Sequence, residues 1–90
     1  MTDGYRVVLT GRARRDLEQS LPEKVAAAAY EFIAGPLRES PHRVGKRLRG
    51  ELSPRYSARR GEYRVIYQIL GRRLVIVAIT ISHRRDVHRR

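Results

Sequence analysis

The feature that most limits the fold is a series of three strand-like segments in the second half of the chain. Residues 56–60, 63–70 and 73–82 are rich in apolar and β-branched side chains, and Gly61-Glu62 and Gly71-Arg72 separate them. Runs of this kind, punctuated by glycine-containing turns, are typical of consecutive antiparallel strands. The sequence therefore predicts an antiparallel meander in this half.

The first half of the chain predicts one strand and two helices. Residues 5–10 read as a strand, and Thr10-Gly11 can begin a short helix with Ala13 and Leu17 on its apolar side. A second helix is expected to begin near residues 20–23, where serine and glutamate have capping-box spacing. Its core-facing stripe follows helical spacing and comprises Val25, Ala28, Ala29, Phe32 and Ile33.

Gly35-Pro36 is expected to break or kink the second helix, and residues 37–50 are expected to be irregular. The two longest strand runs, VIYQIL and LVIVAITI, are apolar on both faces, which indicates a sheet covered by helices on one side and partly enclosed on the other. We therefore expect an α+β fold of order β-α-α-β-β-β. In this fold two N-terminal helices pack on one face of a small antiparallel sheet and a basic groove lies on the other. A chain of 90 residues without cysteine is expected to form one domain, residues 1–90.

The positive charge is concentrated in one part of the chain. Residues 1–37 hold equal numbers of acidic and basic side chains, so the whole excess of +11 belongs to residues 38–90. All the basic residues are arginines except Lys24 and Lys46. Arginine can grip a phosphate with two parallel hydrogen bonds and can stack on bases. The composition therefore predicts contact with nucleic acid or the ribosome rather than a merely solubilising surface.

Composition also argues against several functional classes. Without cysteine there is no thiolate nucleophile and no cysteine-ligated zinc. The three histidines are scattered and no carboxylates are paired, so we expect neither a metal site nor a cofactor. The start of the chain, MTDGYRVVL, lacks the charged-then-apolar order of a signal peptide, and no apolar run reaches membrane-spanning length. We expect a cytoplasmic protein with no membrane partner.

The turn between the first two strands of the meander predicts a specific pairing of arginines. If Gly61-Glu62 is a two-residue turn, Arg60 pairs with Tyr63 and Arg59 lies opposite Arg64 on the same face. Two guanidinium groups placed opposite each other destabilise a sheet unless an anion lies between them. This geometry predicts a phosphate clamp, and the alternative is that both side chains extend into solvent.

The motifs LRGEL, SARRGEYRVIYQI and HRRDVH, together with GKRLRG and the two early helices, resemble the RelE/ParE superfamily of bacterial toxins, and most of all its RelE branch. The resemblance covers nearly the whole chain. It implies a toxin of a type II toxin-antitoxin pair that enters the ribosomal A site and cuts messenger RNA there. It also implies a small, acidic, RelB-like antitoxin that wraps the toxin and blocks it.

Metal-free RNA cleavage needs a base for the ribose 2′-hydroxyl, cations that stabilise the phosphorane, and an acid for the departing 5′-oxygen. Arginine stays charged at any ordinary pH, so it is a good stabiliser and a poor base. Arg64 matches the YR arginine of the resembled family and is expected to stabilise the phosphate, with Arg59 and Arg84 beside it. Proton carriers are expected among His83, His88, Glu51 and Tyr56. Further RNA contacts are expected from Lys46, Arg47, Arg49, Arg55, Tyr56, Ser57, Arg60 and Arg85.

The chain departs from the resembled pattern at two positions. The last functional position, commonly a tyrosine in the motif HRxxVY, is His88 here, and a histidine could serve there as acid or base. Some relatives carry lysine or arginine at the position of Ser57. The loss of that cation could lower the rate, or could shift the role of base to Glu51 or His83.

Two other functions are compatible with this sequence. ParE-type toxins share the implied fold, lack the ribonuclease residues and poison DNA gyrase; the Arg59/Arg64 pair and the histidines after the last strand argue against that reading. A non-catalytic RNA-binding or ribosome-associated module would stack bases on exposed aromatic rings. Tyr56 is the best stacking candidate, because most other aromatic residues fall in patterns typical of a core.

Overall fold

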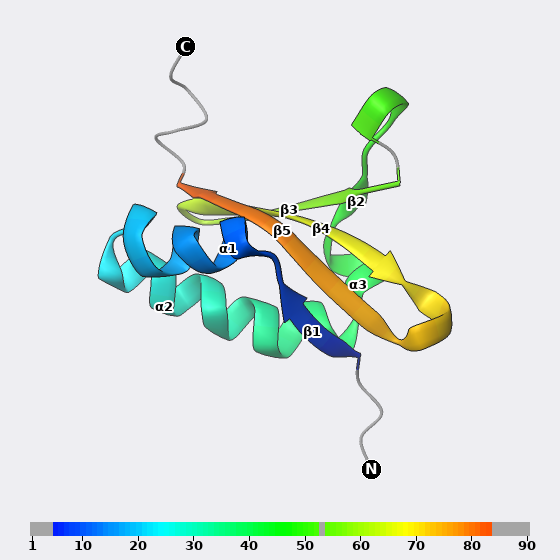
Figure 1. Cartoon of the computed structure of the whole chain (residues 1–90), viewed down its shortest axis with the longest axis horizontal. Helices are drawn as coiled ribbons and strands as arrows, with labels where there is room; N and C mark the ends of the chain where they lie inside the picture. Colours follow the sequence, from blue (N-terminus) through cyan, green and yellow to red (C-terminus); the bar gives the residue numbers. More distant parts are fainter. Residues whose placement is uncertain (1–4, 53, 84–90) are drawn as a thin grey trace.

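The computed structural model describes residues 5–52 and 54–83. Within these ranges the chain forms a five-stranded sheet with helices against one face (Figure 1). The strands are β1 (Arg6–Leu9), β2 (Lys46–Arg47), β3 (Tyr56–Arg60), β4 (Tyr63–Leu70) and β5 (Val75–His83). The α-helices are α1 (Gly11–Arg15), α2 (Glu23–Phe32) and α3 (Pro41–Val44). π-helical turns span Asp16–Ser20 and Ile33–Leu37, and 3₁₀ turns span Gly50–Leu52 and Gly71–Arg73. The predicted α+β class, with helices on one face and an open groove on the other, is confirmed.

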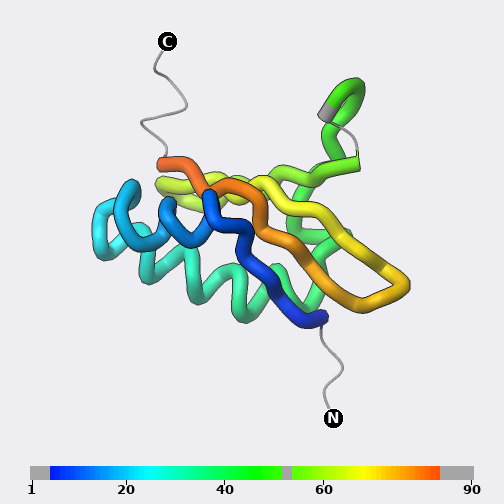
Figure 2. The backbone as a smooth tube through the Cα atoms, viewed as in Figure 1, coloured from blue at the N-terminus to red at the C-terminus, as the bar shows by residue number. Residues whose placement is uncertain are grey.

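The order of the strands in the sheet is β1-β5-β4-β3-β2. The β3-β4-β5 meander is antiparallel, as predicted. However, β1 lies parallel to β5, so the sheet is mixed rather than wholly antiparallel. The path of the chain in Figure 2 gives the reason. After β1 the helical segments lead to β2 at the opposite edge of the sheet, and the meander then returns β5 to the side of β1 in the same direction.

The expectation that residues 37–50 are irregular was wrong for most of them: residues 37–39 and α3 are helical, and the strand β2 also lies inside this segment. Lys46 pairs with Ser57 and Arg47 pairs with Tyr56, both in β3. A two-residue strand shows no alternation in the sequence. It exists because β3 offers it an open edge, which is a tertiary effect.

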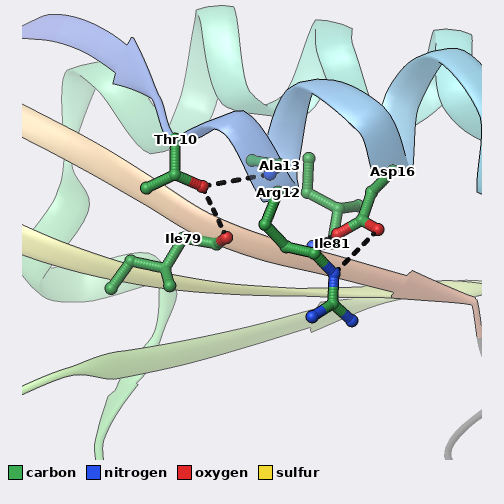
Figure 3. A network of polar contacts seen from close by, with 6 residues as sticks. All are labelled: Thr10, Arg12, Ala13, Asp16, Ile79 and Ile81. Atoms are coloured by element: carbon green, nitrogen blue, oxygen red, sulfur yellow. Dashed lines mark hydrogen bonds and ion pairs between the residues drawn. The ribbon is translucent and has the colours of Figure 1, made fainter.

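The start of α1 lies where the sequence placed it. The Thr10 hydroxyl accepts a hydrogen bond from the Ala13 backbone N–H at 3.0 Å, which caps the helix. The same hydroxyl donates to the Ile79 carbonyl at 2.8 Å (Figure 3). One side chain therefore both begins the first helix and fixes it to β5.

The start of the second helix differs from the prediction. Ser20 belongs to the π-helical turn that follows α1, and Pro22, without a side-chain hydrogen bond, is the N-cap of α2. The predicted capping box is therefore absent. The π-helical turn changes the spacing because it holds Ser20 on the preceding segment, and the Leu21 N–H closes that turn onto the Asp16 carbonyl at 3.1 Å.

The helix does not break at Gly35-Pro36. The backbone widens into the π-helical turn Ile33–Leu37, which contains Pro36, and stays helical through residue 39. A wider turn tolerates the proline ring and its missing N–H better than a regular α-helix does. Pro41 then begins α3.

The core lies between the helices and the covered face of the sheet. The apolar stripe of the second helix is buried as predicted at Val25, Ala29, Phe32 and Ile33, whereas Ala28 is exposed. The Ala28 carbonyl instead accepts a hydrogen bond from the Tyr63 hydroxyl at 3.3 Å. The sheet contributes Val65, Tyr67, Ile76, Ala78 and Ile81. In the described part of the chain, no helix is both long and apolar enough to cross a membrane.

Candidate active site

The hairpin between β3 and β4 has the predicted register. Gly61 adopts a φ of 51°, a left-handed conformation that suits a two-residue turn. Arg60 pairs with Tyr63, and Arg59 lies directly opposite Arg64. Because paired residues in an antiparallel ladder project from the same face, the two arginines share the open side of the sheet.

A hollow of about 490 Å³ lies on this side. It is lined by Val44, Gly45, Lys46, Leu48, Ser57, Arg59, Arg60 and Arg64. Lys46, Arg59 and Arg64 bring cationic groups to this hollow, and none of the lining side chains is acidic. The guanidinium of Arg60 instead lies over the Phe32 ring of α2, 4.8 Å from its centroid. A concave surface with cations alone attracts anions, and arginines placed together on it favour phosphate. We call it the basic groove.

Arg64 is the one cationic residue in the lining of the basic groove that is not exposed. Its side chain is half-buried, and its Nε atom is buried without a hydrogen-bond partner in the described residues. A buried donor that lacks a partner costs about 1–3 kcal/mol, and more when the group is charged. A phosphate oxygen in the groove could satisfy this donor. Arg64 therefore combines a fixed position with unmet hydrogen-bonding capacity.

Close packing brings β2 to the edge of the basic groove. A Cβ atom at Gly45 would overlap the Tyr67 hydroxyl and would come within 2.9 Å of the Ser57 carbonyl oxygen, so only glycine fits there. The Tyr67 hydroxyl donates to the Pro41 carbonyl at 2.6 Å. Burial, and secondarily Tyr56, raises the pKa of Tyr67 to about 12, which keeps it a neutral donor. These contacts position Lys46 opposite Ser57.

Tyr56 is on the other side of β3. Its ring stacks on Tyr67, with centroids 5.5 Å apart and an interplanar angle of 21°. The edge of His42 meets it at 5.9 Å. Its partner in β2, Arg47, shares this face. The ring predicted to stack on RNA is thus half-buried in an aromatic cluster within the protein, away from Arg59 and Arg64.

His83 is also on the helix-covered face. It pairs with Tyr63, and its Nε2 atom lies 3.7 Å from Glu62 Oε1. The residue opposite Arg64 in β5 is Ser82. The structure therefore does not bring His83 together with the paired arginines.

A β-bulge in β5 explains this placement. Ile66 pairs with Thr80 and Tyr67 pairs with Ala78, so Ile79 has no partner in β4. A one-residue shift of register turns all later side chains to the opposite face. A regular hairpin would have put His83 on the face of Arg64. The sequence gives no clear signal for the bulge, and for this reason the pairing of Ser82 with Arg64 was not predicted.

The other predicted residues that the structure describes lie outside the lining of the basic groove. Glu51 is exposed on the 3₁₀ turn Gly50–Leu52, which projects beyond the β2–β3 pair in Figure 1. Arg47, Arg49 and Arg55 are exposed near this turn in the sequence. Arg84, Arg85 and His88 lie outside the described residues. Among the residues that are described, no three His, Cys, Asp or Glu side chains gather as metal ligands would.

Comparison with known proteins defines the class. Residues 7–88 match a family described as the ParE toxin of the type II toxin-antitoxin system parDE. The chain belongs to this family of type II toxins. The resemblance to the RelE/ParE superfamily that the motifs indicated is thereby confirmed.

Similar proteins with known names are RelE-type toxins. The chain is 58% identical over 65 residues to Toxin RelE of Mycobacterium tuberculosis, covering 72% of this chain and 66% of that protein. It is 46% identical over 86 residues to Toxin RelG of the same organism, covering 96% and 98%.

Solved structures agree with this relationship. The fold matches a chain in the M. tuberculosis RelBE2 toxin-antitoxin complex with a TM-score of 0.87 and 45% identity, over 91% of this chain and 100% of that one. It also matches the archaeal RelE-RelB complex of Pyrococcus horikoshii with a TM-score of 0.71 and 30% identity, over 89% and 94%. This chain is therefore a type II toxin of the RelE kind.

Proposed function

We propose that this toxin is a ribosome-dependent endoribonuclease that cleaves messenger RNA in the ribosomal A site. The reaction is attack of a ribose 2′-hydroxyl on the adjacent phosphate, without a metal ion. The observation that carries the proposal is the basic groove, in which Arg59 faces Arg64 and the Nε atom of Arg64 has no partner in the described residues. Both features favour a scissile phosphate between the two guanidinium groups.

The roles follow from the chemistry of the side chains. Arg64 and Arg59 stabilise the added negative charge of the pentacovalent phosphorane, with Arg84 as a third cation. Proton transfer is assigned to the set His83, His88 and Glu51, of which His88 is the candidate acid for the 5′-oxygen. His83 lies on the opposite face of the sheet from Arg64, with its Nε2 atom 3.7 Å from Glu62 Oε1, so the proposal gives it a supporting role.

RNA contacts extend from the basic groove along the same end of the sheet. Lys46, Ser57 and Arg60 lie in the groove lining. Arg47, Arg49, Arg55 and Arg85 are the outer contacts of the proposal, and Tyr56 is left out of it because its ring packs against Tyr67 and His42. Contacts of this kind bind the RNA backbone through its charge and do not depend on base sequence. The proposal places the protein in the cytoplasm, where ribosomes translate.

A cognate antitoxin, small and acidic like RelB, is the second partner in the proposal. The similar M. tuberculosis and P. horikoshii structures are toxin-antitoxin complexes. A second hollow of about 590 Å³ supports such a partner; it is lined by Arg6, Val7, Val8, Leu9, Arg14, Tyr30, Ile33, Ala34 and Arg38. Tyr30 is 58% exposed there and Val8 is 43% exposed. Apolar side chains surrounded by arginines fit an amphipathic acidic segment. We call this hollow the β1–α2 groove.

Gyrase poisoning is the second candidate function, because the matching family is described as the ParE toxin. One experiment separates the candidates. The purified toxin is added to ribosomes programmed with a defined messenger RNA, and in parallel to a gyrase supercoiling assay. We expect messenger RNA fragments that end in a 2′,3′-cyclic phosphate, and unchanged supercoiling. Inhibited supercoiling with intact messenger RNA would support the gyrase function, and arrested translation with intact messenger RNA would support a non-catalytic ribosome-binding module.

A further inference from the structure

The positive charge on the open face of the sheet stops at β4. The basic groove takes its cations from β2, β3 and β4, and Arg64 is the last of them. The next strand, β5, has no acidic or basic residue before His83, which is on the helix-covered face. On the open face, Ser82 of β5 pairs with Arg64. Thr80 pairs with Ile66 on the same face. The groove is therefore bordered on one side by neutral hydroxyl groups.

The β-bulge at Ile79 brings these hydroxyl groups to the open face, and side chains from the helical layer hold it on both sides. The Thr10 hydroxyl donates to the Ile79 carbonyl at 2.8 Å (Figure 3). The Asp16 carboxylate accepts the Ile81 N–H at 2.9 Å. Bulges are common beside active sites, where they re-aim a side chain. Without the bulge, both hydroxyls would lie on the helix-covered face.

Both hydroxyl groups have hydrogen-bonding capacity to offer a ligand. Ser82 and Thr80 are half-buried, and no hydrogen bond joins either hydroxyl to another residue in the part of the chain that the structure describes. A hydroxyl both donates and accepts, so it can pair with either kind of group on the edge of a base. Contacts to phosphate, by contrast, position a nucleic acid without reading its sequence. The border of the groove therefore suits bases, as its cations suit phosphates.

We propose that Ser82 and Thr80 read the bases of the messenger RNA beside the scissile phosphate and so determine which codons the toxin cleaves. The inference rests on the proposed ribonuclease function and names the residues that set its sequence preference. A phosphate held between Arg59 and Arg64 lies over β3 and β4, and β5 is about 4.8 Å further along the sheet. The nucleoside attached to that phosphate can therefore extend over β5. Single-stranded RNA is read in this way, through hydrogen bonds to the edges of unstacked bases.

The test is single-turnover cleavage of ribosome-bound messenger RNAs that carry a randomised codon in the A site. Sequencing of the fragment ends gives a relative rate constant for each codon, and the readout is the ratio between preferred and other codons. Ser82→Ala and Thr80→Val should each lower this ratio by about 2- to 10-fold, the contribution of one hydrogen bond. Arg64→Ala should slow all codons alike and leave the ratio unchanged. Ser20→Ala, which removes an exposed hydroxyl from the π-helical turn after α1, is the matched control and should keep the wild-type ratio.

A further variant makes the test independent of folding defects. Ser82→Asn keeps a donor and an acceptor but moves them away from the backbone, so it should favour a different set of codons, which a misfolded protein cannot do. If Ser82→Ala and Thr80→Val slow every codon equally, or change none, the proposal is wrong. A wild type that cleaves all codons at one rate would also overturn it, with the ribonuclease function intact. Wild-type toxin that leaves every messenger RNA intact would instead refute the proposed function itself.

Discussion

Arg59 of β3 and Arg64 of β4 lie directly opposite each other on the face of the sheet that the helices leave open. Like charges in this position lower the stability of an antiparallel pair. The protein keeps both, and both line the same basic groove. The pair is therefore better explained by what it binds than by the stability of the sheet.

Replacing Arg64 by alanine should separate activity from stability. The loss of one transition-state donor typically lowers the rate about 10²–10³-fold, and removing a repulsive, partly unsatisfied cation should leave the melting temperature equal or higher. Single-turnover cleavage on ribosomes and thermal unfolding measure the two effects. Arg72→Ala, an exposed arginine in the turn before β5, is the charge-matched control. Full activity of the Arg64 variant would remove it from the site.

Binding to ribosomes should weaken steeply with salt, because phosphate contacts release counterions. Arg59→Ala should weaken binding at every salt concentration. Because it removes one phosphate contact, it should also reduce the magnitude of the slope of log affinity against log salt by about one. Equilibrium binding at several salt concentrations, for the wild type and this variant, measures the slope. An affinity that does not change with salt would contradict a phosphate-dominated interface.

Tyr30→Asp should weaken the antitoxin complex. It places a negative charge in the lining of the β1–α2 groove, where an acidic segment is proposed to bind. The measurement is co-purification with the protein encoded by the neighbouring reading frame. Leu74→Asp is the control, because Leu74 is similarly exposed at 51% but lies in the turn before β5. Equal recovery of the complex with both variants would place the antitoxin elsewhere.

Asp16→Ala should lower the free energy of unfolding by about 1–3 kcal/mol, or somewhat more. Asp16 is 5% exposed, accepts the Ile81 N–H at 2.9 Å and accepts the Arg12 Nε–H at 3.2 Å (Figure 3). Its loss leaves the buried N–H of Ile81 without that acceptor. Urea unfolding measures the change. Arg12→Ala should cost less than about 1 kcal/mol, because the Arg12 side chain is 62% exposed. Equal effects of the two variants would mean that the ion pair, not the buried bond, stabilises the fold.

Alkaline pH should destabilise the fold through Tyr67. Burial raises its pKa from 10.0 to about 12, so the unfolded chain loses this proton at lower pH than the folded protein does. The stability is therefore complete below about pH 10 and falls as the pH rises toward 12, by about 2 kcal/mol for this side chain. Urea unfolding at several pH values should show the decline, and Tyr67→Phe should make it shallower. An unchanged slope in the variant would assign the decline to other groups.

Features of the site that depend on local sequence could be predicted, whereas features that depend on contacts between distant segments could not. The Arg59–Arg64 pairing followed from a two-residue turn and from strict alternation on either side of it, which are local effects. The place of His83 depended on the bulge at Ile79, and the role of the segment around Lys46 depended on the free edge of β3. Both are set by tertiary packing. For the same reason Tyr56 was expected to be available for bases, although Tyr67 and His42 already occupy its ring.

The bare backbone at Gly45 has a consequence for how this toxin can vary. Because Gly45 has no side chain, β2 packs closely against β3. The distance from Lys46 to Arg59 and Arg64 therefore depends on a residue that carries no charge. Any larger residue would push that strand outward and spread the cations apart. If the groove binds RNA as proposed, a single methyl group at position 45 would therefore weaken that binding without removing any charge from the sequence.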